Sequence, residues 1–191
     1  MKGKASMFVF IIVLGTILTT LLVAVDSYTK PMIDRNAELK RKTTILQAFE
    51  IPYDAETIEQ AFADNIRGRG TGGEKYYLSK DDTVAFIFGG SGLWGPITGV
   101  LAMNPDMQEI QRIVIMHQEE TPGLGSRIAE RDFLDRFTTK VFGTGLMLVP
   151  EGKSNSNSEI DGITGATMSS EALIGILNED YVQFNQIVNS E

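Results

Sequence analysis

The sequence predicts an α+β fold, an antiparallel β-sheet with helices packed on it, preceded by one N-terminal transmembrane helix. Three observations lead to this prediction. Residues 7–25 (MFVFIIVLGTILTTLLVAV) form an apolar run without a charge. Residues 75–117 are rich in β-branched and aromatic side chains and are divided by short turns, which is typical of antiparallel hairpins. Residues 169–188 place apolar side chains at the spacing of an amphipathic helix.

The apolar run has the length of a membrane span. As a helix, its 19 residues rise roughly 28 Å, close to the thickness of a bilayer's hydrocarbon core. A secretory signal peptide is the alternative, because Lys2 and Lys4 precede the run. The apolar part of a signal peptide is shorter, about 7–15 residues, and ends at a small-x-small cleavage site. This run ends in Val-Ala-Val-Asp, so we interpret residues 1–28 as a retained single-pass anchor.

The charges beside the span leave its orientation open. Two lysines precede it, whereas five basic residues follow within residues 30–42. The positive-inside rule would therefore place the folded domain in the cytoplasm. The alternative is that the short N-terminus stays inside and the acidic domain crosses the membrane.

Two helices and a loop are predicted between the anchor and the sheet. Residues 34–49 have a moderately amphipathic pattern and predict a helix that Pro52 ends. Residues 54–66 predict a second helix with Asp54 as its N-cap. The glycines of residues 67–74 (RGRGTGGE) predict a flexible loop.

We divide the chain into the anchor, a helical linker over residues 29–70 and a folded domain over residues 71–191. Strands are predicted in the folded domain at residues 75–79, 83–89, 97–103, 109–117 and 145–149. Helices are predicted there at residues 128–137 and 169–188.

Composition excludes several kinds of site. The chain has no cysteine, which excludes disulfides, cysteine–zinc sites, iron–sulfur ligation and thiol catalysis by its own residues. His117 is the single histidine, so a multi-histidine metal site is also excluded, and we predict no metal. The net charge of -8 argues against nucleic acid as a partner.

The segment Gly90-Ser-Gly-Leu-Trp-Gly95 matches the G-x-G-x-x-G pattern of dinucleotide-binding turns. That fingerprint requires a helix to begin directly after the glycines. Pro96 and a predicted strand follow instead, so we reject a dinucleotide site. Two interpretations remain, a wide glycine-rich connection between strands, or a glycine surface that lets a flat ligand approach, with Trp94 available to cover it.

The segment Glu119-Glu-Thr-Pro-Gly-Leu-Gly-Ser126 predicts a rigid turn with exposed amides. Pro122 fixes its own φ, and Gly123 and Gly125 permit backbone angles that other residues avoid. The segment is either a plain connection or a binding loop, and the residues alone do not decide between these interpretations.

The segment Asp161-Gly-Ile-Thr-Gly-Ala-Thr-Met-Ser-Ser170 directly precedes the last predicted helix. Unpaired N–H groups and the positive end of the helix dipole at such a position favour an anion such as phosphate. Gly165 and Ala166 leave room beside Thr167. The segment is therefore either a capping loop or a phosphate site, and helix capping alone would need one hydroxyl rather than four.

These motifs resemble a known family. The stretch DGITGAT resembles the D-G-x-(S/T)-G-A-T flavinylation motif of the FMN-binding domain. That domain occurs in the G subunit of the Rnf complex and in the C subunit of the sodium-pumping NADH:quinone oxidoreductase. EETPGLGSRI and GLWGPITGVLA resemble further segments of the same proteins, and an N-terminal span also fits.

The resemblance implies that Thr167 carries covalent FMN through a phosphoester bond, attached by a separate flavin transferase that uses FAD as donor. It leaves Ser169 and Ser170 as helix caps and implies no catalytic residue of the chain's own. The other cofactor-binding residues that it implies are Asp161, Gly162, Thr164, Gly165 and Ala166 of the motif, Glu120, Thr121, Pro122, Gly123, Leu124 and Gly125, and Leu93 and Trp94.

The function implied is that of a membrane-anchored electron-transfer subunit in an ion-translocating oxidoreductase complex. The partners would be the other membrane subunits, the flavin transferase and membrane lipid. The soluble domain would lie outside the cytoplasm, at the inner membrane, contrary to the count of basic residues.

Four identities remain open. The short length favours the G subunit of an Rnf complex, a ferredoxin:NAD oxidoreductase, whereas the GLWG stretch is closer to the C subunit of the sodium-pumping enzyme. We favour the Rnf protein and keep the sodium-pumping one as the alternative. The remaining alternatives are an anchored scaffold domain without cofactor and a stand-alone reductase with dissociable FMN.

Overall fold

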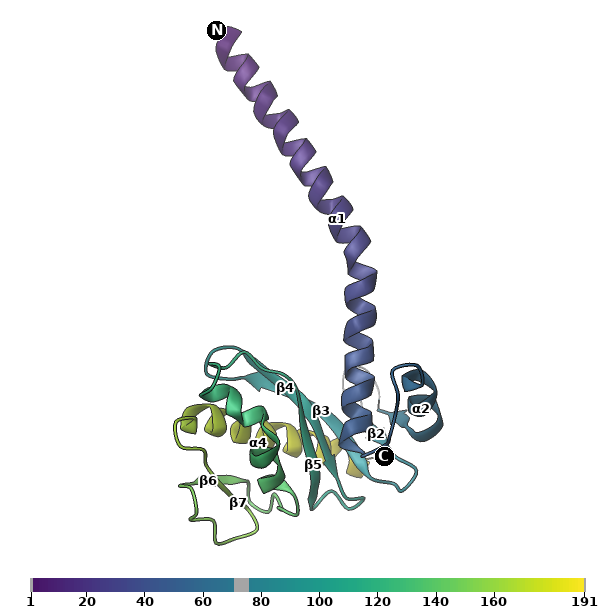
Figure 1. The fold of residues 1–191 in the computed structure, drawn as a ribbon, viewed down its shortest axis with the longest axis vertical. Coiled ribbons are helices and arrows are strands. Elements are labelled where there is room, and N and C mark those ends of the chain that lie inside the picture. The colour runs from purple at the N-terminus through teal and green to yellow at the C-terminus, as the bar shows by residue number, and fades with distance from the viewer. Residues whose placement is uncertain (1, 71–75, 191) are drawn as a thin grey trace. The chain divides into compact units, whose positions relative to one another are not determined.

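The computed structural model describes residues 2–70 and 76–190 of the chain. The chain divides into two compact units, residues 1–40 and residues 41–191 (Figure 1). The first unit belongs to one long helix, and the second contains the sheet.

Helix α1 (Lys2–Ala48) runs through the predicted anchor without interruption. It is long and apolar enough to cross a membrane, and its apolar side chains between Met7 and Val25 are exposed. The expected division into a span and a separate helix over residues 34–49 is wrong. Pro31 lies inside the helix, where it removes one backbone N–H donor and its ring crowds the carbonyl of Ser27.

The end of α1 is set by Glu50 rather than by Pro52. Glu50 adopts a left-handed conformation with φ of 55°. The amide of Glu50 donates to the carbonyl of Gln47 at 3.1 Å, and the amide of Ile51 donates to that of Leu46 at 2.9 Å. This pair of bonds is a Schellman motif, which satisfies the last carbonyls of a helix.

Helix α2 (Ile58–Asn65) begins four residues later than the predicted N-cap, Asp54. Thr57 stands at the N-cap position, because the amide of Thr57 donates to the Asp54 carbonyl at 2.9 Å and forms a turn first. Residues 67–69, expected as a loop, form strand β1 (Arg67–Arg69). Gly70 follows the strand without regular structure, and residues 71–74 of that expected loop lie outside the described residues.

The four strands predicted between residues 75 and 117 are confirmed, and they form a five-stranded antiparallel sheet with β1 in the order β1-β2-β3-β4-β5. The four are β2 (Tyr76–Leu78), β3 (Val84–Ser91), β4 (Pro96–Met103) and β5 (Ile110–His117). The α+β class is therefore confirmed, with each pair of neighbours antiparallel.

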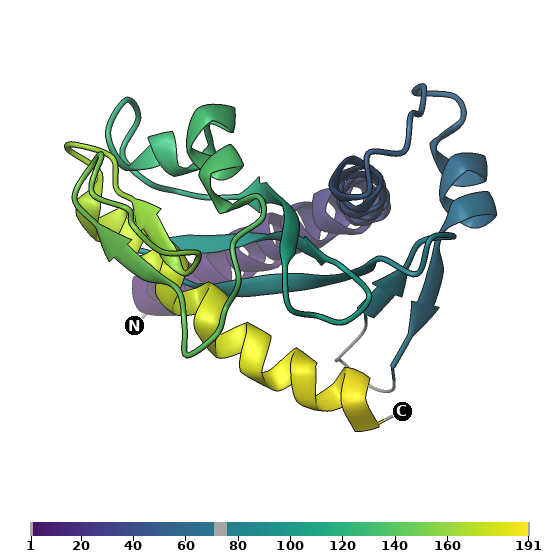
Figure 2. The same cartoon turned by 90° about the horizontal axis from the view of Figure 1, so that it is seen from below.

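Helix α4 (Thr167–Ser190) covers one face of the sheet (Figure 2). The rings of Phe86 on β3 and Phe184 on α4 stack with centroids 4.4 Å apart. Gly90 lets the helix approach β3 closely, since a Cβ there would lie 2.6 Å from Ile176 Cγ1. Apolar packing thus fixes how α4 lies on the sheet.

On the same side of the sheet as α4, next to strand β5, the expected helix over residues 128–137 is replaced by three short pieces, whose buried Ile128, Phe133 and Phe137 share one core with α4. They are η1 (Gly125–Ala129), α3 (Arg131–Leu134) and η2 (Asp135–Phe137). Glu130 separates the first two, because its backbone is extended with φ of -71° and ψ of 141°.

A second, two-stranded sheet precedes α4. It pairs β6 (Met147–Val149) with β7 (Glu159–Asp161) in parallel. The predicted strand over residues 145–149 is therefore present but shorter. The motif of residues 161–170 begins at Asp161, the last residue of β7, and leads directly into α4.

Candidate functional site

Three segments that lie far apart in the sequence meet around one cavity of about 310 Å³. They are the turn between β3 and β4, the loop after β5, and the start of α4. The cavity is lined by Leu93, Trp94, Thr121, Leu124, Gly125, Gly165, Ala166, Thr167, Met168 and Ser169. All three motifs singled out in the sequence therefore contribute to one site.

The turn between β3 and β4 is tight rather than wide. Ser91 pairs with Pro96, and the amide of Gly92 donates to the carbonyl of Gly95 at 2.8 Å. Leu93 and Trp94 stand at its tip, and Trp94 is 71% exposed. The two glycines are needed for packing, because a Cβ on either would lie within 2.5 Å of a glutamate oxygen from the following loop.

The loop after β5 folds into a turn held by its own atoms. The amides of Leu124 and Ser126 both donate to the carbonyl of Thr121 at 3.1 Å, and the amide of Gly123 donates to Ser126 Oγ at 3.0 Å. Gly123 has φ of 74°, a conformation that favours glycine. The turn predicted here is confirmed, but these amides are used inside it rather than exposed for a ligand.

Glu120 joins the three segments from beneath the cavity. The residue is buried, with 4% of its surface exposed. Oε1 accepts hydrogen bonds from the amides of Leu93 at 2.8 Å and Trp94 at 3.2 Å. Oε2 accepts one from Ser169 Oγ at 2.6 Å. One buried carboxylate thus binds the tip of the β3–β4 turn and the first turn of α4 to its own loop.

Thr167 is the first residue of α4, and its side chain is exposed. Gly165 has φ of 86°, which turns the chain into the helix. The expectation that Ser169 and Ser170 cap the helix is wrong, because α4 begins before them. Ser169 donates to Glu120, and Ser170 donates to the carbonyl of Ala166 at 2.9 Å. The Thr167 hydroxyl therefore stands at the helix start, where the first N–H groups lack helical partners.

Asp161 lies away from the cavity. Its Oδ1 accepts hydrogen bonds from the amides of Lys153 and Ser154, each at 2.9 Å. These bonds, the one from Ser154 above all, hold the pKa of the Asp161 carboxyl below its ordinary value. Asp161 therefore stabilises the loop between β6 and β7 instead of touching a ligand in this cavity.

A second cavity, of about 380 Å³, lies on the other side of Thr167. Gly162 and Thr164 line it together with Gly165, Thr167 and two carboxylates, Glu151 and Glu171. Thr164 Oγ1 donates to Glu151 Oε2 at 2.9 Å. Pro122 and Gly123 line neither cavity and belong to the loop after β5. The predicted cofactor-binding residues are therefore divided between the first cavity, the second cavity and this loop.

Two arginines that the sequence analysis missed hold the main chain before Thr167. Arg136 Nη1 donates to the carbonyls of Asp161 and Gly162, each at 2.9 Å. Arg127 Nη1 donates to the carbonyl of Thr164 at 3.2 Å. Arg127 lies two residues after the ETPGLG turn, and this position was a signal for it, whereas nothing in the pattern around Arg136 pointed to this role.

Residues 92–181 match the family model of the FMN-binding domain. The chain contains an FMN-binding domain. The matched region begins at the β3–β4 turn and includes every segment around the cavity. The cavity therefore lies inside the FMN-binding domain, and the resemblance identified from the motifs is confirmed.

Curated relatives of this FMN-binding domain are named as the C subunit of Na(+)-translocating NADH-quinone reductase. The chain is 32% identical to the protein from Pasteurella multocida over 107 residues, 51% of this chain and 41% of that one. It is 29% identical to the protein from Vibrio vulnificus over 160 residues, 78% of this chain and 61% of that one. The chain spans about half the length of the curated relatives it matches.

Two solved structures share the fold. NqrC from Shewanella oneidensis superposes with a TM-score of 0.71 at 17% identity, covering 81% of this chain and 100% of that one. The C subunit of the Na(+)-translocating reductase from Parabacteroides distasonis superposes with a TM-score of 0.71 at 23% identity, covering 82% of this chain and 96% of that one. The relatives thus carry the name of the alternative interpretation, the sodium-pumping enzyme, rather than of the Rnf protein that we favoured.

The residues around the cavity fit FMN. Its walls are largely apolar, with Leu93, Trp94, Leu124 and Met168 exposed around it, as a flat aromatic ring requires. A hydroxyl at a helix N-terminus suits a phosphate, because the helix dipole and free N–H groups favour an anion. The volume of about 310 Å³ lies at the lower end of the range for small-molecule sites.

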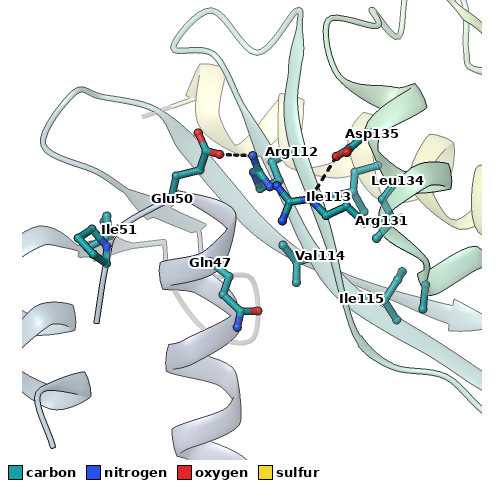
Figure 3. A pocket seen from close by; sticks show the side chains of 12 residues that line it. Gln47, Glu50, Ile51, Arg112, Ile113, Val114, Ile115, Arg131, Leu134 and Asp135 are labelled. Carbon is teal, nitrogen blue, oxygen red and sulfur yellow. Dashed lines mark hydrogen bonds and ion pairs between the residues drawn. The ribbon is translucent and has the colours of Figure 1, made fainter. Parts of the chain in front are cut away.

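A larger cavity of about 490 Å³ lies elsewhere in the unit of residues 41–191, between the end of α1, β5 and α3 (Figure 3). Its two arginines are already paired, Arg112 with Glu50 and Arg131 with Asp135, the latter at 3.6 Å. It contains none of the predicted site residues. Size alone therefore does not identify the functional site of this domain.

Proposed function

We propose that this chain is a membrane-anchored electron-transfer subunit that carries FMN covalently on Thr167. The complex would be a Na(+)-translocating NADH-quinone reductase, with this chain in the place of its C subunit. The observation that carries the proposal is the position of Thr167. Its exposed hydroxyl stands at the first residue of α4 and borders an apolar cavity inside the FMN-binding domain.

The attachment reaction is a transfer of FMN from FAD by a separate flavin transferase. Thr167 Oγ1 would form the bond to the flavin phosphate, the pyrophosphate bond of FAD would break, and AMP would leave with the proton. Because Thr167 is exposed on the folded domain, the transferase can reach its hydroxyl. The phosphodiester keeps a negative charge, which the N-terminus of α4 stabilises by about 0.3–1 kcal/mol.

We place the flavin ring in the cavity beside Trp94 rather than in the one beside Glu151. Trp94, Leu93 and Leu124 offer an aromatic and apolar surface on the first side. Two carboxylates, Glu151 and Glu171, line the other side and would repel an anionic cofactor. Bound flavin would accept electrons from one neighbour and pass them to another, while the chain supplies position and electrostatics.

The anchor and the partners complete the proposal. α1 would span the membrane once and contact lipid, and the soluble domain would lie on the extracytoplasmic side of the inner membrane. The chain would consist of three functional regions: the anchor of residues 1–28, the linker of residues 29–70 and the flavin-carrying domain of residues 71–191. The other membrane subunits would donate and accept the electrons, and ion movement would belong to the whole complex.

The experiment is fluorescence of the denatured protein in a gel under ultraviolet light. The full chain is produced in a host that has the flavin transferase, with and without the substitutions Thr167→Val and Ser169→Ala. We expect a fluorescent band for the unchanged protein and for Ser169→Ala, and a dark band for Thr167→Val. A dark band for the unchanged protein would favour a scaffold domain or, if the native protein is yellow, a dissociable flavin.

A further inference from the structure

The carboxylate of Glu120 contacts both other walls of the flavin cavity without lining that cavity itself. It accepts hydrogen bonds from two amides of the β3–β4 turn and from Ser169 on α4. The amide of Glu120 donates to Gln118 Oε1 at 2.6 Å, which fixes the loop from which the side chain projects. Glu120 therefore couples the segment that carries Trp94 to the segment that carries Thr167.

The carboxylate of Glu120 occupies the space that a side chain at Gly92 or Gly125 would take, so only glycine fits at these two positions. A Cβ on Gly92 would lie 2.4 Å from Glu120 Oε1. A Cβ on Gly125 would lie 2.8 Å from Glu120 Oε2 and 2.5 Å from Ser169 Oγ. The walls of the cavity are therefore built closely around this one carboxylate.

We propose that Glu120 is the positioning residue of the flavin site and that its carboxylate also lowers the reduction potential of the flavin. It holds the Trp94 turn and the first turn of α4 at a fixed separation, so the flavin ring lies in one orientation. Reduction adds electrons to the ring, and a carboxylate shielded from water disfavours that addition more than an exposed one would. The inference rests on the proposed function in so far as the flavin occupies this cavity.

Glu120→Gln separates the charge from the hydrogen bonds. The glutamine Oε1 can accept from the amides of Leu93 and Trp94, and its Nε2 can donate to Ser169 Oγ. Glu120→Ala removes both the charge and the bonds. Glu119→Gln is the matched control, because Glu119 is the neighbouring acid in the same loop but its side chain is 56% exposed.

The full chain is purified in detergent from a host with the flavin transferase, and three properties are measured. They are the intact mass, the visible circular dichroism of the bound flavin and its midpoint potential. For Glu120→Gln we expect unchanged mass and dichroism, with the ratio of reduced to oxidised flavin at a fixed potential raised about tenfold. That change corresponds to about 30 mV for a two-electron couple. Glu119→Gln should change the ratio by less than about twofold, since water screens an exposed charge.

For Glu120→Ala we expect flavin to stay attached while its visible dichroism is largely lost, because the ring is no longer held in one orientation. Trp94, the single tryptophan of the chain, reports the wall without any flavin. In a Thr167→Val background, its fluorescence anisotropy should fall with Glu120→Ala and stay unchanged with Glu120→Gln.

Two results would overturn the inference: unchanged flavin dichroism and Trp94 anisotropy in Glu120→Ala, or an unchanged potential in Glu120→Gln. If Glu120→Ala does not fold, the glutamine variant still decides, because its hydrogen bonds are kept. Absence of flavin from the unchanged protein would instead contradict the proposed function. In that case the Trp94 anisotropy of the flavin-free protein tests whether Glu120 fixes the β3–β4 turn. Equal anisotropy in Glu120→Ala and in the unchanged protein would then contradict the inference independently of the flavin.

Discussion

Arg136 Nη1 donates a hydrogen bond to the main-chain carbonyl of Asp161 at 2.9 Å. The same nitrogen donates to the carbonyl of Gly162, so one guanidinium holds the chain that leads to Thr167. Arg136 lies on η2, which packs against β5, and it also faces Glu151 at 3.7 Å. The motif is therefore anchored to the main sheet through a residue outside it.

Removing this guanidinium should loosen the segment before Thr167. We expect Arg136→Leu to lower the free energy of unfolding by about 1–3 kcal/mol, because two carbonyls lose a charged donor. Arg136→Lys should recover only part of this, since an ammonium lacks the planar fork of donors. Urea unfolding of the full chain in detergent measures both, and equal stability of all three proteins would contradict this role.

Gly125 should not tolerate a side chain, because the Ser169 and Glu120 side chains occupy the space beside its Cα. We expect Gly125→Ala to destabilise the fold by about 1–3 kcal/mol through overpacking. Gly175 in α4 is the matched control, since a Cβ there would meet nothing within 4 Å. Gly175→Ala should stabilise by about 0.5–1 kcal/mol, as expected for alanine inside a helix. The same sign for both substitutions in thermal unfolding would argue against a closely packed site.

Asp180 on α4 should make stability fall as pH rises. Burial raises the pKa of its carboxyl above the ordinary 3.8, with a smaller contribution from Glu179, although the hydrogen bond from the Gly89 amide opposes the shift. The folded state therefore binds the proton more tightly than the unfolded state, and stability is lost as pH rises from 3.8 through the raised pKa.

Asp180→Asn keeps an acceptor for the Gly89 amide and removes the titration. We expect the stability of this variant relative to the unchanged protein to increase between about pH 4 and pH 7, because only the unchanged protein then loses the bound proton. Glu179→Gln is the control and should leave most of the pH dependence in place. Urea midpoints across this range check it, and parallel curves for Asp180→Asn and the unchanged protein would contradict the prediction.

The sequence predicted the elements whose periodicity is strong. Strands β2 to β5 and helix α4 could be predicted from their apolar patterns, because the sheet and the helix bury apolar faces against each other. Boundaries that depend on local turns were less accurate. The left-handed Glu50 after α1, the N-cap of α2 at Thr57 and the extended Glu130 depend on backbone angles that no residue type in these segments dictates.

The motifs around the proposed flavin site were visible in the sequence, but their arrangement was not. The meeting of Leu93, Glu120 and Ser169 depends on contacts between residues far apart in the chain, which follow from strand pairing and from the packing of α4. For the same reason the sequence could not show that the Asp161 carboxylate, expected among the cofactor-binding residues, accepts hydrogen bonds from the loop between β6 and β7. Arg136 was missed because an arginine in a short polar helix has no distinctive pattern.

The covalent bond is the central claim, and the motif offers two threonines for it. Thr164 Oγ1 donates a hydrogen bond to Glu151, and Thr164 lines the cavity that contains two carboxylates. Thr167 stands at the helix start beside the apolar cavity. The most direct measurement is the intact mass of the full chain, of Thr164→Val and of Thr167→Val, each produced with the flavin transferase. We predict that the first two carry the added mass of FMN less one water and that Thr167→Val has the mass of the bare polypeptide. Added mass on Thr167→Val, or none on the unchanged chain, would contradict a covalent flavin on Thr167.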